Sequence, residues 1–326
     1  MLALFGASAL APAAAQAELY YLIVGGIGGE QKYQEQFDKE VASLASVARK
    51  TTGDARVTVL QGDKATREAI EKSFASLARK VKPTDSLAVF LVGHGSYDGE
   101  IYKFNLPGPD IDGDGLAQLL KSVPARQQLV VNATSASGAI LDKWTGEGRT
   151  LITATKSGME RNATRFAEHW AKALADGSAD INKNGAITAQ EAFDYASREV
   201  EDSFKKQGTL ATEHPQIAGG AAARFTVARL GGQAAPATPE VAALNAEKDR
   251  IDGEIEDLRA RRTQMANEDY LNQLQALLVK LADVQGKIDA AGGKPAEGSR
   301  PAREPSQAPD TGVRDETLPR QQELPR

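Results

Sequence analysis

The sequence contains no cysteine and lacks any apolar run of the length that a membrane helix needs. The missing cysteine excludes a thiol nucleophile, and the missing apolar run excludes a transmembrane anchor. An excess of basic residues is also absent: the net charge of −5 argues against a general nucleic-acid binder. What is present is 41% hydrophobic residues in a chain of 326, enough for one large domain with additions.

The N-terminus has the composition of an export signal. Residues 1–17 are first apolar and then small, and they end in Ala15-Gln16-Ala17, an A-x-A cleavage pattern. The basic residue that usually opens such a signal is missing, which a misassigned or truncated start would explain. The alternative to an export signal is an apolar N-terminus that is disordered or packs on the core. We expect cleavage after Ala17 and export to the periplasm or the extracellular space.

Short apolar runs that end in glycine or polar residues alternate with helical patterns over residues 18–230. This alternation predicts an α/β fold of three layers, in which helices flank a mostly parallel sheet. In such sheets the site lies beyond the carboxyl ends of the strands. The expected strands fall in 18–26, 56–63, 85–96, 128–138, 149–158 and 223–230, and the expected helices in 31–50, 66–81, 113–123, 163–177 and 188–208.

Beyond residue 230 the composition changes. Residues 231–240 form a linker, and residues 241–290 carry apolar residues at spacings of three and four in two sets that are out of phase. This pattern predicts a helical hairpin or coiled coil. A tight hairpin and one long helix with a stutter both remain open, as do packing on the domain, partner binding and self-association. Residues 291–326 are Pro-rich and charged, so we expect a disordered tail.

Two of the expected strands end in residues that suit acyl-transfer chemistry. His94 follows one strand in FLVGHGS, and Ser135 and Ser137 follow the next in VVNATSASG. Neighbouring parallel strands would bring these ends close together, and a histidine beside a hydroxyl is the arrangement of a base-activated nucleophile. Gly95 and Gly138 would allow sharp turns and close approach of a substrate.

This pair of motifs resembles the caspase-hemoglobinase peptidases, which include caspase-like domains, legumains and their bacterial relatives. Those enzymes carry His-Gly after one strand and Cys-x-Ser-Gly after the next. The resemblance places His94 at the base, Ser137 and Gly138 at the Ser-Gly, and Ser135 at the cysteine. The segment His214-Pro215-Gln216 resembles the close of bacterial caspase-like domains. The resemblance covers about residues 18–230 and implies a caspase-like fold.

The departure from the family pattern bears directly on activity. The family chemistry needs a thiolate, and a serine hydroxyl is a far weaker nucleophile without a well-placed base. We therefore expect a non-catalytic relative, a pseudopeptidase used for binding or scaffolding, with a protein or peptide partner held in the groove or on the C-terminal helices. The alternative is an active hydrolase that uses Ser135 as nucleophile with His94, with Gly95, Ser137 and Gly138 lining the groove.

Residues 180–191, DINKNGAITAQE, match the calcium-loop pattern D-x-[DN]-x-[DN]-G-x5-E without a mismatch. The pattern assigns side-chain or carbonyl oxygens to positions 1, 3, 5, 7, 9 and 12 of the loop, with a bidentate carboxylate last. The alternative is a turn between helices without an ion. We expect structural Ca²⁺, weakly bound because few ligands are charged. The expected ligands are Asp180, Asn182, Asn184, Ala186, Thr188 and Glu191.

Overall fold

The structure is a computed structural model that describes residues 17–230 and 239–291. Apart from a few end residues, the expected signal peptide (1–17), the linker (231–240) and the Pro-rich tail (291–326) lie outside the described residues.

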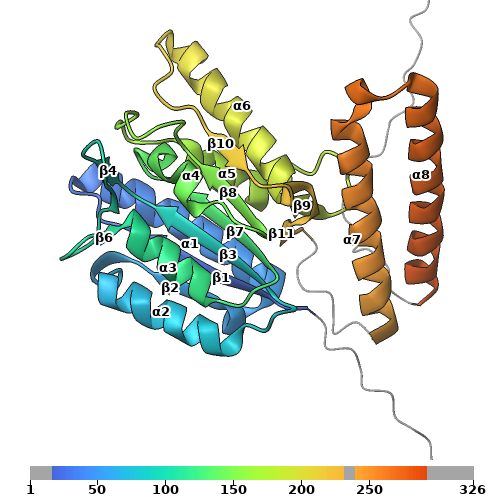
Figure 1. Cartoon of the computed structure of the whole chain (residues 1–326), viewed down its shortest axis with the longest axis horizontal. Coiled ribbons are helices and arrows are strands. Elements are labelled where there is room, and N and C mark those ends of the chain that lie inside the picture. Colours follow the sequence, from blue (N-terminus) through green and yellow to red (C-terminus); the bar gives the residue numbers. More distant parts are fainter. Residues whose placement is uncertain (1–16, 231–238, 292–326) are drawn as a thin grey trace, which may run out of the picture. The chain divides into compact units, whose positions relative to one another are not determined.

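A mostly parallel sheet forms the centre of the α/β domain (Figure 1). Its strands are β1 (Leu19–Gly25), β2 (Val57–Leu60), β3 (Ser86–Val92), β7 (Gln127–Asn132), β8 (Arg149–Thr153) and β10 (Gln216–Ala218). Their order across the sheet is β10-β8-β7-β3-β1-β2, and β10 alone among these strands runs antiparallel to its neighbour.

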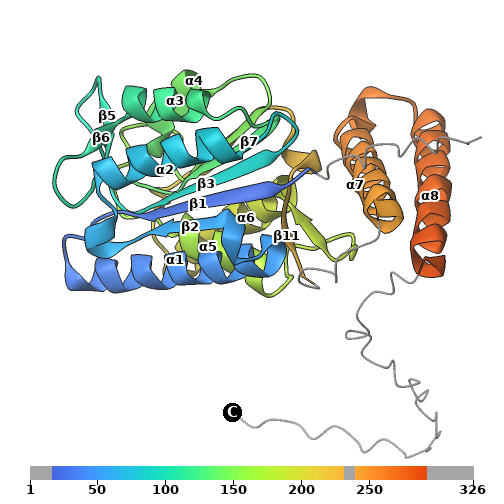
Figure 2. The ribbon, with the colours of Figure 1, turned by 90° about the horizontal axis from the view of Figure 1, so that it is seen from below.

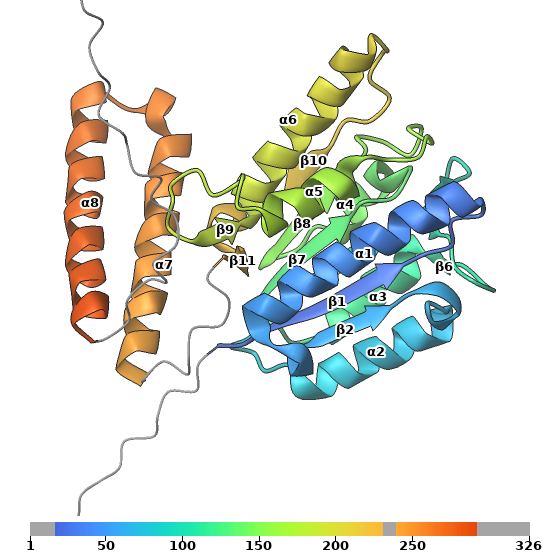
Figure 3. The same ribbon diagram turned by 180° about the vertical axis from the view of Figure 1, so that it is seen from behind.

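Helices cover both faces of this sheet (Figure 2). They are α1 (Gln31–Thr52), α2 (Arg67–Lys80), α3 (Gly113–Ser122), α4 (Leu141–Trp144), α5 (Phe166–Ala175) and α6 (Ala189–Gln207). Alternate residues of each strand point to opposite faces. In β1, Tyr21 and Ile23 join the core under α1, α5 and α6, whereas Leu22 and Val24 join the core under α2, α3 and α4. Figure 3 shows the face that α1 and α5 cover.

These observations confirm the predicted fold class. The central strands are buried on both faces, which is why they read as continuous apolar runs in the sequence. Helix α2 also begins where its sequence predicts, because the Thr66 hydroxyl accepts a hydrogen bond from the Ala69 N–H at 3.2 Å.

The strand expected at 223–230 forms, but it is not part of the central sheet. It is β11 (Thr226–Arg229), which pairs antiparallel with β9 (Ala186–Thr188) in a separate small sheet. The edge of the central sheet is instead filled by β10, which no periodic pattern in the sequence predicts. A strand of three partly buried residues is too short to show a periodic pattern.

A further small sheet follows β3. It consists of β4 (Gly95–Tyr97), β5 (Tyr102–Phe104) and β6 (Ile111–Asp112), all antiparallel. These strands are also too short to be predicted from periodicity. They place the Tyr102 hydroxyl 2.6 Å from the Thr134 hydroxyl, so the sheet supports the loop that follows β7.

The C-terminal segment is a helical hairpin, which decides between the two arrangements that the sequence left open. Helices α7 (Pro239–Ala260) and α8 (Asn267–Ala290) are joined through the short 3-10 helix η5 (Arg262–Gln264). Apolar residues of both helices pack against one another across the hairpin, whereas Leu271 and Leu278 of the second set are about half exposed. The buried residues of this contact are Ile251, Ile255, Val284 and Ile288.

Candidate functional site

The loops that carry His94 and Ser135 meet at the carboxyl edge of the sheet. Strands β3 and β7 are parallel neighbours, and Leu91 stands opposite Asn132 near their ends. Beyond these ends, a Cβ atom added to Gly95 would lie 2.4 Å from the Ser135 carbonyl oxygen. The backbones of the two loops are therefore in contact, and this contact requires glycine at position 95.

The His94 side chain is directed toward helix α1. Its ring makes edge-on contacts with the rings of Tyr33 and Phe37, with centroids 5.0 Å apart in each pair. Burial lowers the pKa of His94, and a hydrogen bond with the Gly28 backbone opposes this only in part. The imidazole is therefore neutral at neutral pH. Among the described residues, no hydrogen bond joins His94 to Ser135.

Ser135 is closed off from solvent. The residue is 2% exposed, and its hydroxyl has no hydrogen-bond partner within the described part of the chain. The next residue, Ala136, has a left-handed backbone with φ of 56°, which an alanine adopts only when its surroundings impose it. The constraint is visible: the Ala136 N–H donates to the Glu160 carbonyl at 2.7 Å.

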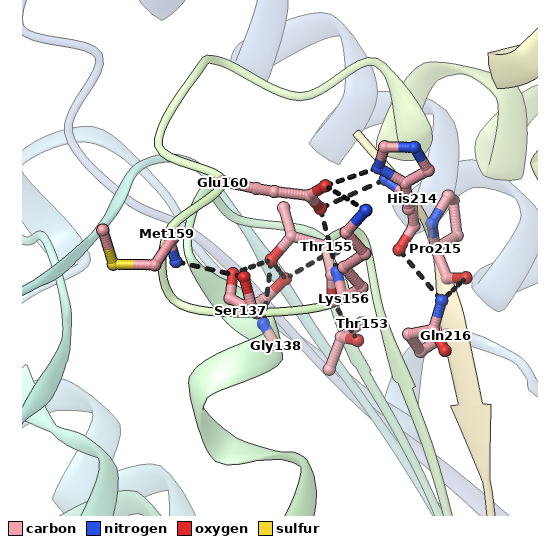
Figure 4. Close-up of polar contacts among 11 residues, drawn as sticks. Ser137, Gly138, Thr153, Thr155, Lys156, Met159, Glu160, His214, Pro215 and Gln216 are labelled. Atoms are coloured by element: carbon pink, nitrogen blue, oxygen red, sulfur yellow. Dashed lines mark hydrogen bonds and ion pairs between the residues drawn. The ribbon is translucent and has the colours of Figure 1, made fainter. Parts of the chain in front are cut away.

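Ser137 and Gly138 contact the end of β8. The Ser137 and Thr155 hydroxyls lie 3.2 Å apart, and the Gly138 N–H donates to the Thr155 hydroxyl at 2.8 Å (Figure 4). A Cβ atom at Gly138 would lie 2.1 Å from the Ser157 nitrogen. The polar groups that were expected to line a groove are thus engaged in internal contacts.

Residues 135–138 are called here the serine loop. The segment of residues 155–160, called here the cover segment, follows β8 and lies against this loop. Gly158 packs on Tyr97, since a Cβ there would lie 2.3 Å from the ring. The Glu160 carboxylate accepts the Lys156 N–H at 2.9 Å and the His214 N–H at 3.3 Å, and it also contacts His214 Nδ1 (Figure 4). Glu160 thereby ties the cover segment to the segment before β10.

Glu160 had no signal in the sequence, because a glutamate between a methionine and an arginine in a loop looks like an ordinary solvated residue. His214 was selected only through the family resemblance, and the structure makes it the partner of Glu160. The cover segment therefore holds the backbone of residues 136–138 and is itself tied to the segment before β10.

Two buried carboxyl groups near this edge were also missed. Glu213 is 4% exposed and accepts the N–H groups of Arg165 and Phe166 at the start of α5, at 2.8 and 2.9 Å. Glu40 is equally buried and accepts a hydrogen bond from Gln36 at 2.8 Å. Burial raises the pKa of Glu213 to about 7 and that of Glu40 to about 8.

The loop of residues 180–191, called here the calcium loop, folds around its own side-chain oxygens. The two Asp180 carboxylate oxygens accept the N–H groups of Asn184 and Gly185, each at 3.1 Å. Gly185 has φ of 78°, the left-handed turn that the sixth loop position requires. The side-chain oxygen of Asn182 accepts the Asn184 N–H at 3.0 Å, and the side-chain oxygen of Asn184 accepts the Ala186 N–H at 2.8 Å.

The end of the calcium loop starts helix α6. Thr188 is the N-cap, and Glu191 bonds back to its N–H at 3.0 Å, which completes a capping box. The donor set is entirely oxygen, as calcium prefers. Two features of the structure differ from those of a typical calcium-binding helix-loop-helix. Helix α5 ends at Ala175, before the loop begins, and the described residues contain no cluster of three or more histidine, aspartate or glutamate side chains placed to hold a metal.

Comparisons with known proteins give matches in structure alone. No family model and no curated protein matches the sequence. In all, 157 solved chains match the structure. Two of these matches are crystal structures with a TM-score of 0.43 each. A Geobacter sulfurreducens protein is 12% identical, over 62% of this chain and 92% of its own. Caspase-1 from Spodoptera frugiperda is 14% identical, over 67% of this chain and 94% of its own.

A caspase is among the solved structures that the chain matches. At this identity the likeness concerns the fold and assigns no activity. Within the described ranges, no helix combines the length and apolarity of a membrane span.

Proposed function

We propose that the protein is a caspase/legumain-like pseudopeptidase, which acts by binding a protein or peptide partner and not by hydrolysis. The observation that carries this proposal is the Ser135 hydroxyl, which is buried and has no hydrogen-bond partner in the described structure. A serine nucleophile needs an adjacent base to activate it. His94 occupies the position that the resemblance assigns to this base. Its ring is instead packed against Tyr33 and Phe37.

An active hydrolase is the rival function, and one observation favours it. The lowered pKa of His94 leaves a neutral imidazole at neutral pH, the form that can accept a proton from a hydroxyl. To act on Ser135, the ring would have to leave its contacts with Tyr33 and Phe37, and the buried Ser135 hydroxyl would have to become accessible.

A serine-directed fluorophosphonate probe separates the two functions. We expect no labelling of the wild-type protein, because the hydroxyl is neither activated nor accessible. Labelling that disappears in Ser135→Ala would establish the hydrolase instead. Ser135→Cys is a useful companion: cleavage of peptides by this variant would show that the groove is intact and that the pseudopeptidase lost only its nucleophile.

The second part of the proposal is that the calcium loop binds one calcium ion, which stabilises the fold. It is supported by the match of the loop pattern, by the left-handed turn at Gly185 and by the oxygen-only donor set. The residues that would hold the ion are the six predicted ones, from Asp180 to Glu191. With two carboxylates among them, we expect a Kd of roughly 10⁻⁴ to 10⁻³ M.

Unfolding experiments on chelator-treated protein test the calcium site. At a free calcium concentration of about 100 times Kd, the free energy of unfolding should rise by about 2.7 kcal/mol. Magnesium should have little effect, because it requires tighter octahedral geometry. Glu191→Gln should remove most of the response, and glutamine still allows the capping box with Thr188. A Glu191→Gln protein that responds like the wild type would reduce the calcium loop to a turn.

The proposed location is the periplasm or the extracellular space, after cleavage behind Ala17. N-terminal sequencing of protein from the cell envelope should begin at Glu18. A second surface for a partner, or for self-association, is the hairpin, where Leu271, Leu278 and Val279 of α8 are about half exposed or more. Sedimentation at several concentrations tests self-association directly.

A further inference from the structure

Helix α7 contacts the calcium loop through the carboxylate of Asp252. One oxygen of this carboxylate accepts hydrogen bonds from the Asn184 side-chain amide at 2.8 Å and from the Lys248 ammonium group at 3.0 Å. Asp252 is only 8% exposed. A carboxylate buried to this degree is stable only while its partners remain in place, so the contact with Asn184 is a defined part of the fold.

This contact fixes the orientation of the Asn184 amide. A carboxylate can only accept hydrogen bonds, so the nitrogen of the amide must face Asp252. The amide oxygen then faces the interior of the loop, where it accepts the Ala186 N–H at 2.8 Å. Asn184 is the fifth position of the calcium pattern, which supplies an oxygen to the ion. Asp252 therefore selects the one amide orientation that can bind a cation.

A second contact holds α7 beside the same region. The Asp257 carboxylate lies 2.5 Å from the Arg224 guanidinium group, and Gly253 allows the stem of Arg224 to pack against the helix. Arg224 ends the 3-10 helix η4 (Ala222–Arg224), which precedes β11, the partner strand of β9 in the calcium loop. Helix α7 thus contacts the calcium loop directly and also contacts η4, which leads into β11.

We propose that Asp252 is a positioning residue for the calcium loop, and that calcium binding and the docking of α7 are therefore coupled. This inference rests on the calcium site proposed above. An ion bound to the Asn184 oxygen polarises the amide and strengthens its N–H bond to Asp252. Residues that orient ligands in this way commonly change metal affinity by 10–100-fold. By linkage, calcium must strengthen the docking of α7 as much as docking strengthens calcium binding.

The test uses the full chain and the pair Asp252→Ala and Asp283→Ala. Asp283 also pairs with a lysine four residues away in the hairpin, Lys287, but it is exposed and makes no contact with the calcium loop in the described structure. Calcium titrations followed by thermal unfolding should show a midpoint about 10-fold higher or more for Asp252→Ala. The Asp283→Ala midpoint should equal that of the wild type.

Hydrogen exchange gives the second measurement. Calcium should slow amide exchange in α7 of the wild type and of Asp283→Ala, but not in Asp252→Ala. If the wild type shows no response to calcium at all, the calcium site itself is wrong. If the wild type responds and Asp252→Ala has the same midpoint, the calcium site stands and the coupling is wrong. Should Asp252→Ala fail to fold, Asp252→Leu, which is close in size and offers no acceptor to the Asn184 amide, decides by the same comparison.

Discussion

The serine loop after β7 and the calcium loop make an instructive pair, because short sequence motifs pointed to both. In the serine loop the motif residues serve the fold: Ser137 and Gly138 bond to Thr155, and Ser135 is covered. In the calcium loop the motif residues shape a backbone that presents oxygens. A motif therefore predicts the path of the local backbone in both loops, whereas segments distant in sequence determine whether its side chains are available for chemistry.

The calcium loop and helix α1 also differ in how they hold a buried carboxyl group. In the calcium loop, Asp180 accepts two N–H groups from its own loop. On helix α1, Glu40 has a single side-chain amide as its described hydrogen-bond donor, and desolvation dominates its pKa. The arrangement around Glu40 favours the protonated acid. A change of pH should consequently alter stability mainly through the region around Glu40, whereas calcium should alter it through the calcium loop.

The largest effect should come from Glu40→Gln. The pKa of Glu40 is about 8 in the folded protein and near 4.5 when unfolded, so the native state holds the proton more tightly. Stability is fully present below the unfolded pKa and is lost as pH rises toward 8, at up to about 1.4 kcal/mol per pH unit. Glu40→Gln should remove the part of this decline that Glu40 contributes and raise stability at pH 8, while the part from Glu213, whose pKa is raised to about 7, stays.

Urea unfolding at pH values from 5 to 8 measures this effect. Glu35→Gln, on an exposed position of the same helix, is the control and should keep the wild-type slope. Both variants should retain the full calcium response. An unchanged pH dependence in Glu40→Gln would show that Glu40 is ionised in the folded protein.

A smaller loss is expected from Gly138→Ala. The added methyl group would meet the Ser157 backbone at 2.1 Å, and a backbone atom cannot simply rotate away. Overpacking of this kind costs about 1–3 kcal/mol of the free energy of unfolding, unless the cover segment is displaced. Gly146→Ala, where the new methyl group would meet nothing within 4 Å, is the matched control.

Fluorophosphonate labelling of Gly138→Ala sharpens this comparison. Increased labelling at Ser135 would mean that the cover segment alone keeps the serine unreactive. Absence of labelling, together with faster exchange in residues 155–160, would assign the lack of reactivity to the missing base.

The smallest effect should come from Asn182→Asp in the calcium loop. The substitution adds a negative charge at the third ligand position and retains an oxygen that can accept the Asn184 N–H. Calcium affinity should rise by about fivefold, or about 1 kcal/mol. Calcium titration of the unfolding temperature measures the shift, and it should shrink at high ionic strength if charge is its cause. A midpoint that does not move would argue against an ion beside residue 182.

Much of the fold could be predicted from the sequence because the central strands are buried on both faces. Their apolar runs end abruptly, as β3 does before Gly93 and His94, and Thr66 marks the start of α2. Strand β10 could not be predicted, because its place at the sheet edge depends on pairing with β8 and not on its own composition. The hairpin was undecided because its turn uses no glycine or proline.

The candidate site was predictable only in part, for a related reason. Strand adjacency brings the loops of His94 and Ser135 together, and that adjacency follows from the alternation of strands and helices. The direction of the His94 ring depends on Tyr33 and Phe37, and the left-handed backbone at Ala136 depends on the Glu160 carbonyl of the cover segment. Neither contact leaves a local pattern in the sequence.

The hydrogen bond from the Tyr21 hydroxyl to the Val227 carbonyl, at 2.7 Å, has a consequence for how the chain folds during synthesis. Strand β1 is made first, yet the core on its α1 side includes Val227 and Ala228 of β11. A nascent chain cannot close this core until those residues have left the ribosome. Contacts so distant in sequence slow folding, and shorter fragments expose apolar surface that favours aggregation. Ribosome-bound chains that stop before Val227 should therefore depend on chaperones to remain soluble.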